Sequence, residues 1–321
     1  MGTWTTLGDL LNITFTFSAA LIFAAMGGIF SERSGVVNIA LEGLMVAGAF
    51  AAAIGAYYME QADMAGLAPW IGLLCAAVFG AAFSLIHAFA TITYRADQVV
   101  SGVVINFLAL GFCVYMVPLL FDGAGQTRTL IQGGFEKRAI PVLSQIPVLG
   151  KGVFTSYPTT YLALVSVVIM WYVLFRTPFG LRLRAVGEHP GAADTVGVKV
   201  NRVKYIGVML SGMLAGIGGA TITLTTSSNF AHNTVSGQGF IALAAVIFGK
   251  WHPFGALAAA TFFGFSQALG SYVQIYEWAN QIPREWIYML PYVLTLIVLA
   301  GFVGKSVAPA SLGEPYDPGK R

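Results

Sequence analysis

Charged side chains are scarce in this sequence. Lys and Arg number 17 and Asp and Glu number 14 in 321 residues, so that only 10% of the chain is charged. Soluble domains carry about 25% charged residues, and so few cannot cover the surface of a soluble protein of this size. The shortage excludes a soluble enzyme, a nucleic-acid-binding domain and a disordered scaffold. Because 57% of the residues are hydrophobic, the composition indicates an integral membrane protein with several spans.

Cysteine and the usual motifs of catalysis are also lacking. The two cysteines, Cys75 and Cys113, both lie in apolar runs and cannot build a disulfide framework or a metal site. The sequence has no phosphate-binding loop of the P-loop type and no nucleophile accompanied by a base. We therefore expect no catalytic residue, metal or cofactor on this chain, and any ATP that it uses binds to another chain. The segment Met1–Leu10 has no Lys or Arg, so a cleaved signal peptide is not expected.

What the sequence does contain is a series of nine apolar stretches, in which the only formal charge is Glu42. They cover residues 10–30, 36–58, 67–94, 99–121, 158–175, 205–227, 238–249, 254–276 and 287–303. Such stretches predict transmembrane helices, because backbone in lipid must satisfy its own hydrogen bonds. We expect an all-α polytopic protein with a single membrane domain over residues 1–307 and a polar cytoplasmic tail over 308–321.

One of these stretches is too short to cross the bilayer. A helix over 238–249 would rise about 18 Å, whereas the hydrocarbon core is about 30 Å thick. Gly237, Gly239, Gly249 and Pro253 bracket this stretch. We expect either a half-helix buried among its neighbours or a helix that flanking residues extend.

Basic residues predict the orientation. The link 176–204 carries Arg176, Arg182, Arg184, Lys199, Arg202 and Lys204, against only Glu188 and Asp194. Such an excess favours the cytoplasmic side. Alternation along the chain then places Arg33, Arg95, Lys250, Lys305 and the C-terminus inside, and Glu60, Asp63, Glu277 and the N-terminus outside. In the long outer link 122–157, apolar fragments near residues 142–149 predict a short element on the outer surface.

Polar residues inside the apolar stretches are the first candidates for a transport path. Glu42 lies in one stretch, and Asn38 four residues earlier is expected on the same helical face. Glu42 either accepts hydrogen bonds from a neighbouring helix end in a purely structural role or lines a translocation path. Asn106 either bonds across helices or binds a neutral, hydroxyl-rich solute. His87, alone in an apolar helix, is interpreted as a packing residue rather than a proton relay.

Small residues at regular spacing in the stretch 205–227 indicate close packing of helices. Two ridges recur at four-residue spacing and predict close helix contacts: Ser211, Ala215 and Gly219, and Gly212, Gly216 and Ala220.

A short helix is predicted in the link 176–204, where Pro190 suits the start of a helix and Gly197 its end. The small residues between them would give this helix a smooth face that fits a groove in a partner. The alternative is an ordinary basic loop.

The residues around this short helix resemble the loop by which permeases of ATP-binding-cassette (ABC) importers dock on their ATPases. Three further segments agree. The segment 35–45, GVVNIALEGLM, and the segment 239–250, GFIALAAVIFGK, are similar to the early and late membrane motifs of ribose-type and branched-chain amino-acid-type permeases, and 251–256, WHPFGA, also fits. Taken together, these segments most resemble the simple-sugar and nucleoside subgroup of these permeases. In that subgroup the chain would be the shorter of two paired permeases. The resemblance covers about residues 10–305.

This resemblance implies a type II importer permease in the cell membrane, with about eight to ten transmembrane helices in two pseudo-symmetric halves. Its implied partners are a second, homologous permease, a cytoplasmic ABC ATPase and an extracytoplasmic lipid-anchored solute-binding protein, besides membrane lipid. The implied ATPase-docking residues are Gly187, Glu188, His189, Pro190, Gly191, Ala192, Ala193 and Asp194. Asn38, Glu42 and Asn106 are the candidate path-lining residues.

The function that we expect is that of the membrane subunit of an ATP-driven nucleoside importer. Simple sugars are the nearest alternative cargo. A zwitterionic amino acid would ask for charged or helix-end partners and is less favoured. An ion-coupled secondary transporter would need an intramembrane relay, which one carboxylate and one histidine hardly provide. A scaffold that merely anchors an ATPase is a third possibility.

Overall fold

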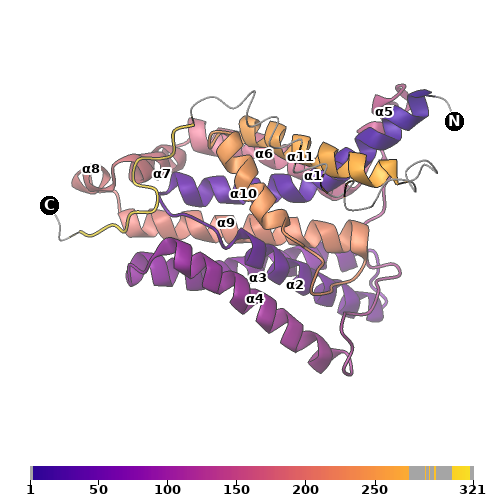
Figure 1. The fold of residues 1–321 in the computed structure, drawn as a ribbon, viewed down its shortest axis with the longest axis horizontal. Coiled ribbons are helices and arrows are strands. Elements are labelled where there is room, and N and C mark those ends of the chain that lie inside the picture. Colours follow the sequence, from indigo (N-terminus) through magenta and orange to yellow (C-terminus); the bar gives the residue numbers. More distant parts are fainter. Residues whose placement is uncertain (1–2, 275–285, 287–288, 290–292, 294–305, 319–321) are drawn as a thin grey trace.

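The computed structural model describes residues 3–274, 286, 289, 293 and 306–318. Helices dominate these residues (Figure 1). The long helices are α1 (Thr3–Arg33), α2 (Leu41–Gln61), α3 (Ala68–Ala88), α4 (Gln98–Leu120), α6 (Pro158–Arg176), α9 (Val200–Ile222) and α11 (Pro253–Val273). The shorter helices are α5 (Leu149–Gly152), α7 (Pro178–Glu188), α8 (Pro190–Thr195) and α10 (Gln238–Phe248). Short π-helical turns extend α3 over Phe89–Thr93 and α9 over Thr223–Ser227, and a 3-10 turn covers Leu143–Gln145.

Six helices within the described residues are long and apolar enough to cross a membrane, namely α1, α2, α3, α4, α6 and α9. Each predicted stretch from 10–30 to 254–276 overlaps a helix within the described residues, which confirms the all-helical membrane fold. The ninth stretch, 287–303, lies outside the described residues apart from Met289 and Val293. The stretch 238–249 forms the 11-residue helix α10, so it is a half-helix rather than an extended span.

The helices run between two ends of the molecule (Figure 1). The C-terminal end carries α7, α8 and residues 89–97, 249–252 and 306–318, and the N-terminal end carries residues 62–67 and 121–157. Arg33, Arg95, Lys250 and the link 176–204 thus meet at one end, as the sequence predicts, whereas Lys305 and Glu277 lie outside the described residues. Which end faces the cytoplasm stays a prediction.

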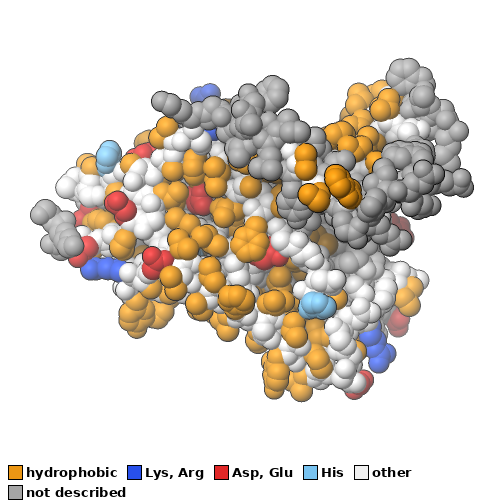
Figure 2. All heavy atoms as spheres, viewed as in Figure 1, with side chains coloured by type: hydrophobic (Ala, Val, Ile, Leu, Met, Phe, Trp, Pro, Cys, Tyr) orange, Lys and Arg blue, Asp and Glu red, His pale blue; other side chains and the backbone are white. Residues whose placement is uncertain are grey.

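Two helices, α1 and α9, form the centre of the bundle. Helix α1 packs against α9, α11, α10 and α6, and α9 packs against α1, α2 and α3. Helices α4 and α6 lie at the periphery and leave large apolar side chains such as Phe107, Tyr115 and Val168 exposed. Hydrophobic side chains cover much of the face shown in Figure 2 between the two ends. Such a surface fits contact with lipid or with another membrane subunit.

The small-residue ridges of α9 let its neighbours approach closely, as the sequence predicts. A Cβ atom on Gly48 of α2 would lie 2.2 Å from the carbonyl oxygen of Gly216. A Cβ atom on Gly80 of α3 would lie 2.3 Å from the carbonyl oxygen of Gly212. Real Cβ atoms do not approach so closely, so only glycine allows these backbone contacts. The close contact replaces hydrophobic burial as the source of helix association in lipid.

The link 122–157 covers the N-terminal end and is tied to the helices at several points. Its strands β1 (Arg138–Ala139) and β2 (Thr155–Ser156) pair antiparallel, and α5 with the preceding 3-10 turn forms the short element expected near 142–149. The Glu60 carboxylate at the end of α2 accepts hydrogen bonds from the backbone N–H groups of residues 131, 132 and 133. Lys151 pairs with Asp9 of α1 at 2.8 Å. These bonds fix the link to α1 and α2.

Candidate functional site

The first element of the candidate site is a non-helical segment, residues 34–40, between α1 and α2. Gly35 has φ of +83°, a left-handed conformation that suits glycine and ends α1. Val37 N–H donates to the side chain of Gln98 at 2.7 Å, so part of the freed backbone finds a side-chain partner. Asn38 is fully buried, and its Nδ2 donates to Ser211 Oγ at 2.7 Å. Because Ser211 lies near the middle of α9, the segment reaches the interior of the bundle.

This segment corrects one prediction. Asn38 and Glu42 do not share a helical face, because α2 begins only at Leu41 and Asn38 precedes it. Apolar residues fill the break as well as the helix, so hydrophobicity alone did not show where the helix starts. Asn38 Oδ1 is buried without a hydrogen-bond partner among the described residues. A buried amide oxygen of this kind is available to a water or a polar solute.

Glu42 joins the beginnings of two helices. It lies in the first turn of α2, and its carboxylate accepts hydrogen bonds from Gly237 N–H and Gly239 N–H, each at 2.7 Å. Those two groups are at the start of α10, where N–H groups lack partners within the helix. Two helix N-termini, each with a partial positive charge, therefore surround one carboxylate.

The close contact at this junction requires glycine. A Cβ atom on Gly239 would lie 2.4 Å from Glu42 Cα, so α10 can begin here only with a bare backbone. The hydrogen bonds match the helix-end alternative that the sequence offered for Glu42. They do not test its place beside a path, which stays a prediction.

Asn106 holds the same junction from α4. Its Oδ1 accepts a hydrogen bond from Gly43 N–H at 2.7 Å, and its Nδ2 donates to the Ile39 carbonyl at 3.0 Å. One side chain thus satisfies an unpaired N–H of the first turn of α2 and a carbonyl of the preceding break. The structure brings Asn38, Glu42 and Asn106 together around the start of α2, although they come from three different segments.

A small hollow lined by hydroxyl groups lies beside the start of α10. It has a volume of about 130 Å³ and is lined by Thr16, Phe17, Ala20, Thr221, Ile222, Thr225, Thr226, Thr234 and Gln238. The hydroxyls of Thr221, Thr225 and Thr226 donate to backbone carbonyls of their own helix, which leaves their oxygens free to accept. Sequence reasoning missed these residues. Their signal was the clustering of threonines over residues 221–226.

Other polar residues of the spans bond within the bundle. The ring nitrogens of His87 contact Ser101 Oγ at 2.9 Å and the Val37 carbonyl at 3.1 Å. The amides of Gln238 and Gln267 bond each other at 3.0 and 3.2 Å. Among the described residues, no group of three His, Cys, Asp or Glu side chains could hold a metal ion.

The predicted docking residues lie at the C-terminal end of the molecule. Helix α8 begins at Pro190, as the sequence predicts, and Gly197 with φ of +82° lies just after it. Gly187 is buried at the end of α7, where a Cβ atom would lie 2.2 Å from the Arg33 carbonyl. His189, Gly191 and Ala192 are exposed.

The start of α8 is linked to α1 and α10. The Glu188 carboxylate lies 4.0 Å from the Arg33 guanidinium, whose Nε donates to the Trp251 carbonyl at 3.0 Å. Trp251 lies in the turn between α10 and α11, and its indole N–H donates to the buried Glu32 carboxylate. Helix α10 therefore has the docking segment near one end and Glu42 at the other.

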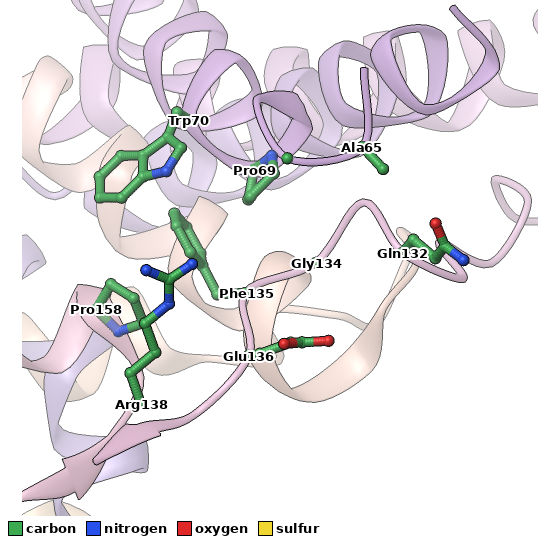
Figure 3. Close-up of a pocket in the computed structure, with 10 residues that line it drawn as sticks. Ala65, Pro69, Trp70, Gln132, Gly134, Phe135, Glu136, Arg138 and Pro158 are labelled. Atoms are coloured by element: carbon green, nitrogen blue, oxygen red, sulfur yellow. The ribbon is translucent and has the colours of Figure 1, made fainter. Parts of the chain in front are cut away.

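A further pocket, of about 330 Å³, opens at the N-terminal end (Figure 3). The rings of Trp70 and Phe135 meet edge to face, with centroids 5.0 Å apart. Figure 3 shows the Arg138 guanidinium beside Phe135, whereas the Glu136 carboxylate points away from this aromatic pair. The pocket does not include Asn38, Glu42 or Asn106.

Comparison with known proteins decides the family. The model of a family described as the permease component of branched-chain amino acid transport systems matches residues 10–299. The chain belongs to this permease family. It is therefore a multi-pass cell-membrane protein and a transporter subunit, not an enzyme.

The individual relatives are permeases of ABC transporters. The chain is 51% identical to the guanosine ABC transporter permease protein NupQ of Bacillus subtilis (strain 168), over 98% of both chains. It is 44% identical to the nucleoside ABC transporter permease protein NupC of Lactococcus lactis subsp. cremoris (strain MG1363), over 97% of both. It is 27% identical to a second guanosine ABC transporter permease of Bacillus subtilis, NupP, over 88% of this chain and 78% of that protein. As an ABC permease subunit, the chain works with an ATPase and a partner permease.

Proposed function

We propose that this permease is one of two membrane subunits of an ATP-driven importer of nucleosides. The observation that carries the proposal is the 51% and 44% identity, over nearly the whole chain, to permeases named for guanosine and nucleoside transport. The polar groups around the start of α2 support it. They are amides, hydroxyls and one carboxylate bound to backbone, which suit a neutral solute rich in hydroxyl and amide groups.

In this proposal, residues 187–194 receive the ATPase and α10 carries its movement inward. The ATPase presses on α8, and the contacts of Glu188 with Arg33 and of Arg33 with Trp251 transmit the displacement to the end of α10. A helix of 11 residues moves as a rigid rod. Its far end holds Glu42, so the junction opens or closes when α10 shifts.

The remaining partners belong to the proposal as well. The second permease covers part of the exposed apolar surface of the outer helices, and lipid covers the rest. A lipid-anchored binding protein delivers the nucleoside to the N-terminal end of the molecule.

Reconstituted transport tests the proposal directly. Proteoliposomes that contain the chain, the partner permease, the ATPase and the binding protein are given labelled guanosine, uridine or ribose, with ATP or with a non-hydrolysable analogue. Guanosine or uridine uptake that requires ATP hydrolysis is expected. Uptake of ribose but of neither nucleoside would show that the cargo is a simple sugar. Uptake that persists without ATP but stops when ion gradients are dissipated would favour a secondary transporter.

A bulky side chain at Gly191 tests the docking surface. A Cβ atom on Gly191 would have no neighbour within 4 Å, so the Gly191→Trp side chain leaves the backbone without a clash in this chain. We expect the ATPase to co-purify at least ten-fold less with this variant. Gly125→Trp, equally free of neighbours but in the link at the other end, is the matched control. An unchanged amount of ATPase on Gly191→Trp would place the docking surface elsewhere.

A further inference from the structure

The C-terminal segment 306–318 returns to the docking helices and bonds to them. Ser311 is 5% exposed, and both its N–H and its Oγ donate to the Gly187 carbonyl, at 3.0 and 2.6 Å. The N–H of Ala310 donates to the Glu188 carboxylate at 3.2 Å. The segment is thus attached to the last two residues of α7, just before α8 begins.

The same segment also contacts the break between α1 and α2. A Cβ atom on Gly35 would lie 2.8 Å from Ser311 Oγ, so the tail lies directly on the left-handed turn that ends α1. This turn is at the start of the segment 34–40, in which Asn38 is buried inside the bundle. Ser311 therefore touches both the docking helices and the start of the path segment.

A third attachment reaches the turn between α3 and α4. Asp317 pairs with Arg95 at 2.9 Å, and Arg95 adopts φ of +55° in this turn. Between the two polar attachments, Leu312 and Tyr316 pack against the apolar core. The tail is held at intervals along its length rather than at a single point.

The tail also forms one wall of a groove beside α8. The groove has a volume of about 430 Å³, with Glu188–Gly191 on one side and residues from Ala310 to Asp317 on the other. Anything that seats against the start of α8 therefore lies next to the tail.

We propose that residues 306–318 act as a coupling strap, with Ser311 as its positioning residue. The strap fixes the α7–α8 junction to the Gly35 turn and, through Asp317, to the α3–α4 turn. A displacement of α8 then moves the path segment 34–40 together with α10, and the strap reinforces the direct contact of Gly187 with the Arg33 carbonyl. This inference rests on the proposed docking of an ATPase at residues 187–194.

Two variants that release the strap test it in the reconstituted complex. Ser311→Leu places a bulky group against Gly35 and Gly187. Asp317→Arg sets two cations against each other, and Arg95→Asp/Asp317→Arg restores an ion pair of reversed sign. We expect both single changes to lower nucleoside uptake per ATP hydrolysed at least five-fold while the ATPase still co-purifies. The double variant should recover at least half of the wild-type ratio.

The matched control is the ion pair of Arg128 and Asp122, which lies in the link at the opposite end, at 3.8 Å. Its disruption by Asp122→Arg, which also sets two cations against each other, should leave the transport ratio unchanged. A wild-type ratio in both Ser311→Leu and Asp317→Arg would overturn the strap. So would a double variant no better than Asp317→Arg, because the loss of transport would then not come from the broken pair of Arg95 and Asp317.

The failure of the strap can be told apart from the failure of docking. If Gly191→Trp loses the ATPase while the strap variants transport normally, the docking site stands and the strap is wrong. If Gly191→Trp keeps both the ATPase and uptake, the docking proposal itself fails, whatever the strap variants do.

Discussion

At the scale of single residues, Glu42 shows how a carboxyl group is accommodated inside a membrane protein. A carboxylate in the middle of a span costs about 2.5–3.5 kcal/mol on insertion scales. Here two backbone N–H groups of α10 bind it, and the positive ends of two helices face it. The same residue satisfies donors of α10 that would otherwise be buried without partners.

Replacing Glu42 separates its structural role from a role in the path. Glu42→Ala leaves two N–H groups of α10 unpaired, so we expect a loss of roughly 1–3 kcal/mol of stability for each, measured as a lower melting temperature in detergent. Glu42→Gln keeps one acceptor oxygen for the two N–H groups, so it should melt between Glu42→Ala and the wild type. If Glu42 lines the path, Glu42→Gln still lowers nucleoside uptake; full uptake by this variant would make Glu42 purely structural.

At the scale of elements, glycine sets how closely the helices pack. A Cβ atom on Gly216 would lie 2.3 Å from the Ala76 carbonyl, so Gly216→Leu must push α9 away from its neighbours. Overpacking of this kind costs about 1–3 kcal/mol or more, and we expect a lower melting temperature and a smaller yield of folded protein. Gly111→Leu on α4, where no atom lies within 4 Å of a Cβ, is the control and should behave as the wild type. Equal melting of the two variants would contradict the close packing of α9.

Most of the helices could be predicted from sequence because a membrane span is a long apolar run. The half-length of α10 was one of the two alternatives that its short run allowed. The extension of the break over residues 36–40 could not be predicted, since Val36, Val37 and Ile39 are as apolar as the helix that follows. What ends the helix there is a left-handed glycine together with side chains from distant segments, Gln98 and Asn106, which bind the freed backbone.

The candidate site was predicted in part. Asn38, Glu42 and Asn106 were noticed because polar groups are rare in apolar runs, and the structure places all three at one junction. The threonine-lined hollow was missed because threonine is common in membrane helices and each hydroxyl can bond its own backbone. The contact of the tail with Gly187 joins residues 124 positions apart, and no local pattern reports such a contact.

At the scale of the whole molecule, the two ends should face opposite sides of the membrane. In a Cys75→Ala/Cys113→Ala background, Gly191→Cys marks the C-terminal end and Gly125→Cys the N-terminal end. A membrane-impermeant maleimide added to intact cells should label only residue 125, and residue 191 should react only after the membrane is opened. The positive charge of the link 176–204 is the reason for this orientation. Labelling of residue 191 in intact cells would show the opposite orientation, in which a cytoplasmic ATPase could not bind α8.

The bridge between Glu42 and the start of α10 also has a consequence for biogenesis. The residues that it joins are 195 and 197 positions apart, and the ribosome makes α2 long before it makes α10. When α2 leaves the translocon, its carboxylate has none of its final partners from α10. The first half of the nascent chain must therefore wait, incompletely assembled, until Gly237 and Gly239 have been synthesised.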